Sequence, residues 1–210
     1  MADDQQRIAW GLALRTNLGA LEELHGIVAE RIERQKALDE ALEEALQRVG
    51  SERLDEAGAL AALSRASDDA ARRARLIAVR LEAALLEGKI DDEAFKAANS
   101  AAFPRGGQAI GNTPAQRFEA LDRIASVLAE HPAADPGGEL AKLATEGAQA
   151  IRDANDSAKR EQTEHKDANE QLTKARHAWD EGYLATKEIV TGLLRDAGRL
   201  VEQRQVFPDL

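Results

Sequence analysis

The fold is decided by residues 139–194, which read ELAKLATEGAQAIRDANDSAKREQTEHKDANEQLTKARHAWDEGYLATKEIVTGLL. The positions of one helical face recur here at alternating spacings of four and three, which is the repeat of a helix packed along a partner helix. No proline interrupts the stretch, so we expect one long helix over 139–205, with 155–157 as the place where a break would fall. The repeat comprises Leu140, Ala144, Gly147, Ile151, Ala154, Ala158, Glu161, His165, Ala168, Leu172, Ala175, Trp179, Gly182, Thr186, Ile189 and Leu193.

The first part of the chain carries the same spacing. Residues 3–49 predict a helix whose repeat shifts phase between Ile32 and Leu38. We expect Gly50 to end this helix and Ser51 to cap a second one, so that residues 3–88 form an antiparallel helical hairpin. The residues expected in the core of the second helix are Leu54, Leu60, Leu63, Ile77, Leu81 and Leu85.

Residues 89–138 read as a loop-rich connector. Asp91 and Asp92 can cap a short helix through Ser100, and the pair Thr113-Pro114 is typical of a helix start. Loops are expected over 103–113 and 133–138, where prolines and glycines gather. The pattern as a whole predicts an all-α fold: one elongated domain over residues 1–210, with long helical hairpins in an antiparallel, coiled-coil bundle.

Composition narrows the range of functions. Hydrophobic residues make up 43% of the chain but aromatic residues only 3%, which favours thin alanine–leucine packing over a thick core. A formal charge of −10 opposes binding to nucleic acid or to anionic lipid. The chain has no cysteine, and no apolar run is long enough to span a bilayer. The acidic N-terminus resembles no secretory signal, so we expect a cytoplasmic protein without a cofactor.

Residues 152–171 contain no apolar side chain larger than alanine. This segment either projects into solvent or packs through its alanines against the alanine-rich middle of the second helix. The alanines of this segment are candidates for a partner interface, as are Trp179, which falls on the seam, and Tyr183 four residues later. For the two aromatic residues the position of Trp179 on the seam favours the alternative, a bulky plug inside the bundle. These candidates are Ala154, Ala158, Ala168, Trp179 and Tyr183.

Two pairs of residues are candidate metal ligands. Glu22 and His25 have the spacing that resembles half of a ferritin-like di-metal motif, while Glu161 and His165 lie four residues apart. A second motif of the required spacing is absent from the sequence, so the di-metal motif is only half present.

Two further patterns are explained without a ligand. Residues 106–113 follow the glycine spacing of a phosphate-binding loop, but Asn112 replaces its lysine and no strand precedes it. Five arginines form a basic stripe on the second helix, and Asp68 and Asp69 are spaced to neutralise Arg72 and Arg73. The stripe consists of Arg65, Arg72, Arg73, Arg75 and Arg80.

No set of residues predicts a catalytic centre. The sequence is therefore interpreted as a non-catalytic structural, scaffolding or protein-interaction bundle that self-associates or binds a protein partner. Two alternatives are a metal-binding bundle, either an enzyme or a storage protein, and a membrane-associated helical protein. The second lacks the basic amphipathic face that it needs.

Overall fold

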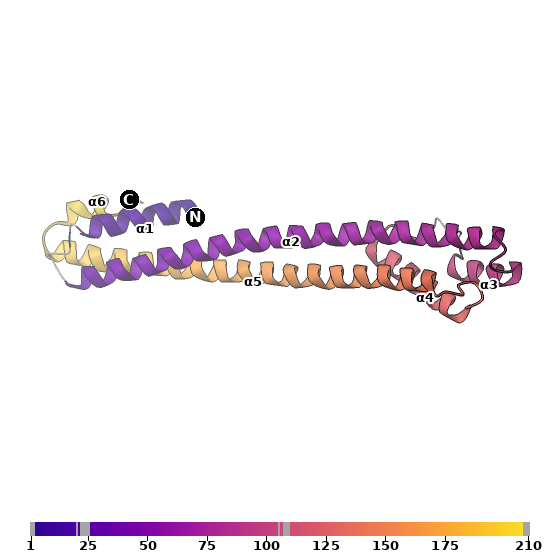
Figure 1. The fold of residues 1–210 in the computed structure, drawn as a ribbon. Coiled ribbons are helices and arrows are strands. Elements are labelled where there is room, and N and C mark those ends of the chain that lie inside the picture. Colours follow the sequence, from indigo (N-terminus) through magenta and orange to yellow (C-terminus); the bar gives the residue numbers. More distant parts are fainter. Residues whose placement is uncertain (1–2, 20, 22–25, 105, 107–109, 208–210) are drawn as a thin grey trace. The chain divides into compact units, whose positions relative to one another are not determined.

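A computed structural model describes residues 3–19, 21, 26–104, 106 and 110–207. Within these residues every regular element is helical, as the sequence predicts, and none is a strand (Figure 1). No described helix has a stretch both apolar and long enough to span a bilayer. The elements are α1 (Asp4–Gly19), α2 (Gly26–Leu86), α3 (Asp92–Ala102), α4 (Pro114–Glu130), α5 (Glu139–Asp196), a 3₁₀ turn (Leu200–Glu202) and α6 (Gln203–Val206).

The chain divides into two compact units. Unit 1 comprises Met1–Leu54 and Thr163–Leu210, and unit 2 comprises Asp55–Gln162. Unit 1 therefore holds α1, the first part of α2, the last part of α5 and α6, whereas unit 2 holds α3, α4 and the remainder of the two long helices. A single domain over the whole chain stays a prediction.

The expected helix end at Gly50 is wrong, because α2 continues through this residue. Gly50 does not adopt a positive φ, and no proline follows to stop the helix. One glycine inside a helix costs about 1 kcal/mol, which the packing of a long helix readily offsets. The first helix instead ends at Gly19, so a hairpin turning at residue 50 does not form.

We expect Gly50→Ala and Gly58→Ala each to raise the free energy of unfolding by about 0.5–1 kcal/mol, the helix-propensity gain. A Cβ at either position meets no atom within 4 Å, so nothing opposes that gain. Urea denaturation followed by far-ultraviolet circular dichroism measures the change. A loss of stability for Gly50→Ala would contradict a helix that runs through residue 50.

Glycines end both long helices, and the end predicted at residue 88 is confirmed. At the end of α2, Gly88 adopts φ +68° and the Lys89 amide donates to the Ala84 carbonyl oxygen at 2.9 Å. At the end of α5, Gly198 adopts φ +70° and the Arg199 amide donates to the Leu194 carbonyl oxygen at 2.7 Å. Both are Schellman ends. The helix expected over 139–205 therefore ends earlier, at Asp196, whereas its continuity through 155–157 is confirmed.

The two short helices begin where their capping residues predict. The Asp91 side chain accepts a hydrogen bond from the Ala94 amide at the start of α3. Thr113 and Gln116 form a capping box at the start of α4, with Pro114 in the first turn. These side chains satisfy amides that have no partner inside the helix, which explains why the short helices form.

Unit 1 has a core of leucines and aromatics from α1, α2, α5 and α6. Its largest fully buried side chains include Trp179, Phe207, Leu14, Leu18 and Leu42. The phase shift expected before Leu38 is wrong. The seam of α2 keeps its spacing of four and three through Val28, Ile32, Gln35, Asp39, Leu42, Leu46 and Val49, because Gln35 and Asp39 are themselves buried.

Unit 2 has a smaller-residue core. Ala70, Ala74, Ile77 and Leu81 of α2 lie in one buried cluster with residues of α3, α4 and α5. Ile77 and Leu81 confirm the predicted core, and Leu63 and Leu85 pack partly buried against it. Leu54, 74% exposed and part of unit 1, and Leu60, 42% exposed, contradict that prediction.

Candidate functional site

A buried carboxylate lies at the centre of unit 1. Asp39 of α2 is 3% exposed. Its Oδ1 accepts hydrogen bonds from Trp179 Nε1 at 2.8 Å and from Gln35 Nε2 at 2.9 Å. Arg15 of α1 places Nε 2.9 Å from Asp39 Oδ2, an ion pair whose angles do not meet those of a hydrogen bond. One carboxylate thus joins α1, α2 and α5.

Burial raises the pKa of Asp39 above the usual range of an aspartate. The hydrogen bonds from Trp179 and Gln35 and the charge of Arg15 act in the opposite direction, and the charge of Glu43 adds to the rise. Loss of hydration is therefore the dominant effect, as expected for a charge placed in an apolar seam.

The approach of α1 to this carboxylate depends on Gly11. A Cβ at residue 11 would lie 2.0 Å from Asp39 Oδ1 and 2.6 Å from Asp39 Cγ. Gly11 lies on the buried face of α1 together with Arg7, Leu14 and Leu18. Glycine is thus required by close contact with the Asp39 side chain rather than by backbone conformation.

Ion pairs hold the N-terminal end of α1 on α5. Arg7, 5% exposed, donates to Asp180 Oδ1 and Oδ2, both at 2.9 Å, a bidentate pair. Arg176 donates to both carboxylate oxygens of Asp4, and Arg7 Nη1 lies 3.3 Å from Asp4 Oδ1. The hydrogen bond from Arg176 is the largest cause that lowers the pKa of Asp4.

We expect Asp4→Asn to lower the free energy of unfolding of unit 1 by about 1–2 kcal/mol at pH 7, because charge-assisted contacts with Arg176 and Arg7 are lost. Since the folded pKa of Asp4 lies below its unfolded value, its contribution is present above the unfolded pKa and is lost as the pH falls through the folded pKa. Urea denaturation at pH 7 and pH 3 should show the difference shrinking. The exposed Glu44→Gln serves as control; an unchanged difference at pH 3 would contradict the linkage.

The structure places the aromatic candidates inside unit 1. Trp179 is 1% and Tyr183 3% exposed. Their rings stack at 4.9 Å between centroids with an interplanar angle of 12°, and Trp10 and Phe207 contact the Tyr183 ring at 6.2 and 6.1 Å. The burial of Trp179 agrees with its position on the seam. Residues of this same chain cover the faces of Trp179 and Tyr183 that a partner protein would contact.

The alanine candidates differ from one another in burial. Ala158 is 3% and Ala168 1% exposed, while Ala154 is half-buried. In unit 2, Ala70 and Ala74 share their buried cluster with Ala144, Ala148 and Ile151, and neither Ala154 nor Ala158 belongs to it. Of the two alternatives for this segment, packing of its alanines against Ala70 and Ala74 is not the contact that forms, because that contact falls earlier on α5.

The candidate metal ligands are not assembled within the described residues. Glu22 and His25 lie outside the described part of the chain. Glu161 is half-buried and its carboxylate lies 2.9 Å from Arg160, and His165 is half-buried one turn later on α5. His165 belongs to no cluster of potential metal ligands that the described residues form.

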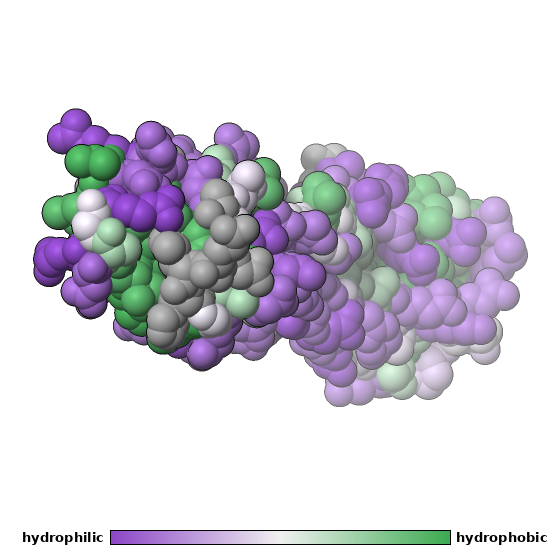
Figure 2. All heavy atoms as spheres, turned by 90° about the vertical axis from the view of Figure 1, so that its left-hand side faces the viewer, coloured by the Kyte–Doolittle hydropathy of each residue, from purple (hydrophilic) through white to green (hydrophobic). Residues whose placement is uncertain are grey.

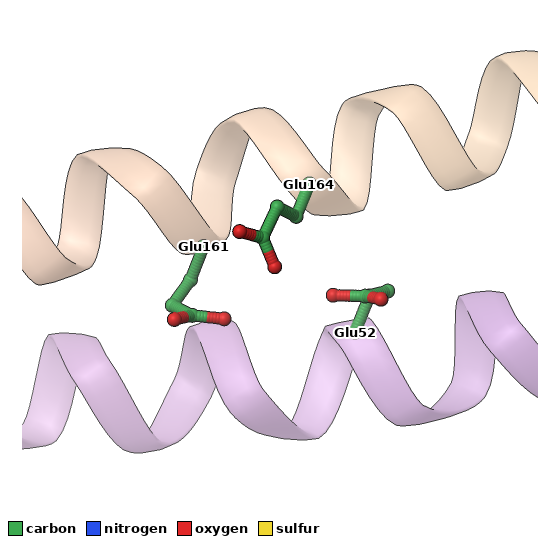
Figure 3. Close-up of side chains that lie close together, drawn as sticks. All are labelled: Glu52, Glu161 and Glu164. Atoms are coloured by element: carbon green, nitrogen blue, oxygen red, sulfur yellow. The ribbon is translucent and has the colours of Figure 1, made fainter.

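Figure 3 labels a further pair of carboxylates in unit 1, Glu52 and Glu164, which have oxygens within 4.8 Å of one another. Glu52 also lies 3.7 Å from Arg48 Nε, across one turn of α2. This cation offsets part of the negative charge of the pair.

Unit 2 presents an exposed apolar face on α2. Leu76 is 42%, Val79 60% and Leu86 87% exposed, and half-buried Ala83 completes the spacing of three, four and three. We name these four residues the exposed stripe. They repeat the pattern of a coiled-coil seam, on the side of the helix opposite to Ile77 and Leu81. Such a seam without a partner is suited to binding another helix.

A groove lies beside the exposed stripe. It has a volume of about 700 Å³ and is lined by the end of α2, by the α4–α5 loop and by the start of α5, with Ala83 common to groove and stripe. The Asp135 side chain accepts hydrogen bonds from the amides of Leu140 and Ala141, at 3.0 and 2.8 Å, and so fixes the groove wall formed by α5.

The arginines around the exposed stripe are only partly neutralised. Asp69 pairs with Arg73 at 2.8 Å and with Arg72 at 3.2 Å, which confirms part of the expected pairing. Asp68 does not pair with Arg72 as expected; it accepts from Arg117 of α4 at 2.8 Å. Among the described residues, no carboxylate pairs with Arg75 or Arg80, and both side chains are exposed.

Unit 1 also exposes apolar side chains where α5 ends and α6 lies. Figure 2 shows apolar side chains grouped at this end of the unit. Leu184 is 57% and Val201 88% exposed, and a groove of about 500 Å³ runs past Leu184, Lys187 and Gln203. These residues do not follow a seam spacing on one helix, so they lack the regularity of the exposed stripe.

Sequence reasoning missed Asp39, Gln35 and the exposed stripe. The signal for the first two is their seam spacing, which their polar side chains obscure. The stripe has the same spacing as a core face, and sequence alone does not distinguish a covered seam from an uncovered one. Comparison with known proteins adds no analogy: no family model, curated protein or solved structure matches the chain.

Proposed function

We propose that the chain is a non-catalytic structural or scaffolding protein that acts by binding other helices, either in a second copy or in another protein. The exposed stripe carries this proposal. Three large apolar side chains at seam spacing, each at least 42% exposed, leave apolar surface on unit 2 that a docked helix would remove from water.

The proposal includes antiparallel coiled-coil packing of α2 against α5 within each unit. In unit 1, Asp39 contacts Trp179 and Arg48 Nη1 donates to Gln171 at 3.0 Å, so rising numbers on α2 meet falling numbers on α5. Both helices carry seam spacing, and packing of one seam on the other leaves the remaining faces of each helix for a partner.

The molecular mass in solution tests self-association. If the bound helix belongs to a second copy, sedimentation equilibrium reports an assembly larger than 22.7 kDa for the wild type and a monomer for the variant Leu76→Gln/Val79→Gln/Leu86→Gln. These side chains are exposed, so the substitutions should change the stability of unit 2 by no more than about 0.5 kcal/mol. The matched control is Leu54→Gln/Leu184→Gln/Val201→Gln, which removes exposed apolar side chains from unit 1.

A monodisperse monomer at high micromolar concentration would remove the self-association half of the proposal. If only the control variant fails to assemble, the binding surface lies on unit 1 and not on the exposed stripe. Neither result depends on the identity of a partner protein.

A further inference from the structure

The charges beside the exposed stripe point to the kind of helix that binds there, an inference that rests on the proposed function. With Leu76 and Ala83 at the a positions and Val79 and Leu86 at the d positions of a heptad, four flanking positions carry charge. Arg75 and Glu82 take the g positions, and Arg80 and Glu87 the e positions. Flanking residues at e and g select the partner and the direction of a paired helix.

Pairing of the exposed stripe with the same stripe of a second copy is disfavoured in both directions. In parallel helices a g residue faces the e residue of the next heptad, which sets Arg75 against Arg80 and Glu82 against Glu87. In antiparallel helices whose stripes overlap in full, like positions face each other, which sets Arg80 against Arg80 and Glu82 against Glu82. Like charges at these positions exclude a partner, and coiled coils use them for that purpose.

The free positive charge favours an acidic partner instead. Residues 65–80 contain five arginines and two aspartates in a chain whose formal charge is −10. Asp68 and Asp69 are already paired with Arg117, Arg72 and Arg73. Glu87, at the other end of the stripe, lies 2.6 Å from Lys89. Arg75 and Arg80 therefore remain as exposed cations at the edge of the apolar face.

We propose that the exposed stripe docks an amphipathic helix of a different protein, with leucine-like side chains on one face and acidic side chains placed against Arg75 and Arg80. The apolar residues of that helix cover Leu76, Val79 and Leu86, and one of its side chains enters the groove beside Ala83. The acidic residues select the partner and exclude a second copy.

Binding of synthetic helical peptides tests the proposal. Three peptides share leucines at seam spacing over about three heptads. In one half of its length, each peptide carries a different residue at the flanking e and g positions: glutamate in the first, glutamine in the second and lysine in the third. In the other half, all three peptides carry glutamine at these positions. We expect the full-length protein to bind the glutamate peptide about tenfold more tightly than the lysine peptide, as measured by fluorescence anisotropy at moderate ionic strength. Arg75→Glu/Arg80→Glu should reverse this preference, because the apolar stripe is unchanged.

The matched control is Lys36→Glu/Arg53→Glu, which reverses two exposed cations of α2 in unit 1 and should leave the preference unchanged. Equal affinity for all three peptides, or a preference that survives the reversal of Arg75 and Arg80, would overturn the acidic partner while leaving a helix-binding function. A dimer abolished by Leu76→Gln/Val79→Gln/Leu86→Gln would do the same by identifying a second copy as the occupant.

Two further outcomes separate the proposals. Binding to vesicles of phosphatidylserine and phosphatidylcholine, without binding to any peptide, would replace the helix by an anionic membrane surface and overturn the inference. If no peptide binds and the protein remains a monomer, the inference and the proposed function both fail.

Discussion

Replacing Asp39 by alanine should lower the free energy of unfolding of unit 1 by about 3–5 kcal/mol, the range observed when one partner of a buried ion pair is removed. The substitution leaves the Trp179 indole and the Gln35 amide without their shared acceptor, and the Arg15 guanidinium without its ion-pair partner. It also leaves unfilled space where α1, α2 and α5 meet. Both tryptophans, Trp10 and Trp179, belong to unit 1, so their fluorescence during urea denaturation reports this unit alone.

Asp39→Asn is the matched control for charge. Its amide keeps one oxygen that accepts from Trp179 and Gln35, so we expect a loss of only about 1 kcal/mol. The pH dependence has the opposite sign to that of Asp4. Because the folded pKa of Asp39 is raised, the wild type should gain stability relative to Asp39→Asn as the pH falls through that folded pKa. An Asp39→Ala variant as stable as the wild type would show that the carboxylate does not hold the three helices together.

The elements best predicted from the sequence have local signals. Thr113 and Pro114 set the start of α4, Asp91 sets the start of α3, and Gly88 ends α2 with a positive φ. A capping hydroxyl or carboxylate and a left-handed glycine act through their immediate neighbours, so the sequence around them contains the whole cause. For the same reason the uninterrupted repeat after Glu139 was enough to predict one continuous α5.

The errors fall where a distant contact decides. Gly50 reads as a helix end, but packing along the seam of α2 keeps it helical. From the sequence alone, Asp39 is interpreted as a surface residue. Its burial depends on a hydrogen bond from Trp179, which lies 140 positions away in the chain. Gln35 and Asp39 are polar and yet buried. A seam traced through apolar residues alone therefore appears to shift at these two positions.

The candidate interaction surface was hidden for the opposite reason. Leu76 and Val79 have the spacing of core residues, and their exposure follows from α3 and α4 packing on the other side of α2, against Ile77 and Leu81. The sequence predicted the arginines next to them as a self-neutralised face. Asp68 instead pairs with Arg117 of α4. The arginines of this face therefore retain more positive charge than the sequence of α2 alone implies.

Gly11→Ala should lower the free energy of unfolding of unit 1 by about 2–3 kcal/mol, although alanine is the better helix former. The added methyl would lie 2.0 Å from Asp39 Oδ1, and the carboxylate cannot turn away without breaking its hydrogen bonds to Trp179 and Gln35. Gly50→Ala makes the same chemical change on an open face of α2 and should be stabilising, so the two variants are expected to differ in sign.

A double-mutant cycle then separates contact with Asp39 from any other effect of the methyl group. In the Asp39→Ala background the carboxylate is gone, so Gly11→Ala should cost at least 1 kcal/mol less than in the wild type, a coupling typical of residues in direct contact. Hydrogen exchange of the α1 amides should show the same coupling, because Gly11→Ala should accelerate exchange less in the Asp39→Ala background than in the wild type. Additive losses in the cycle would mean that α1 is not seated on Asp39, and that its other contacts, the charge pairs of Asp4 and Arg7 and the buried Leu14 and Leu18, determine where this helix docks.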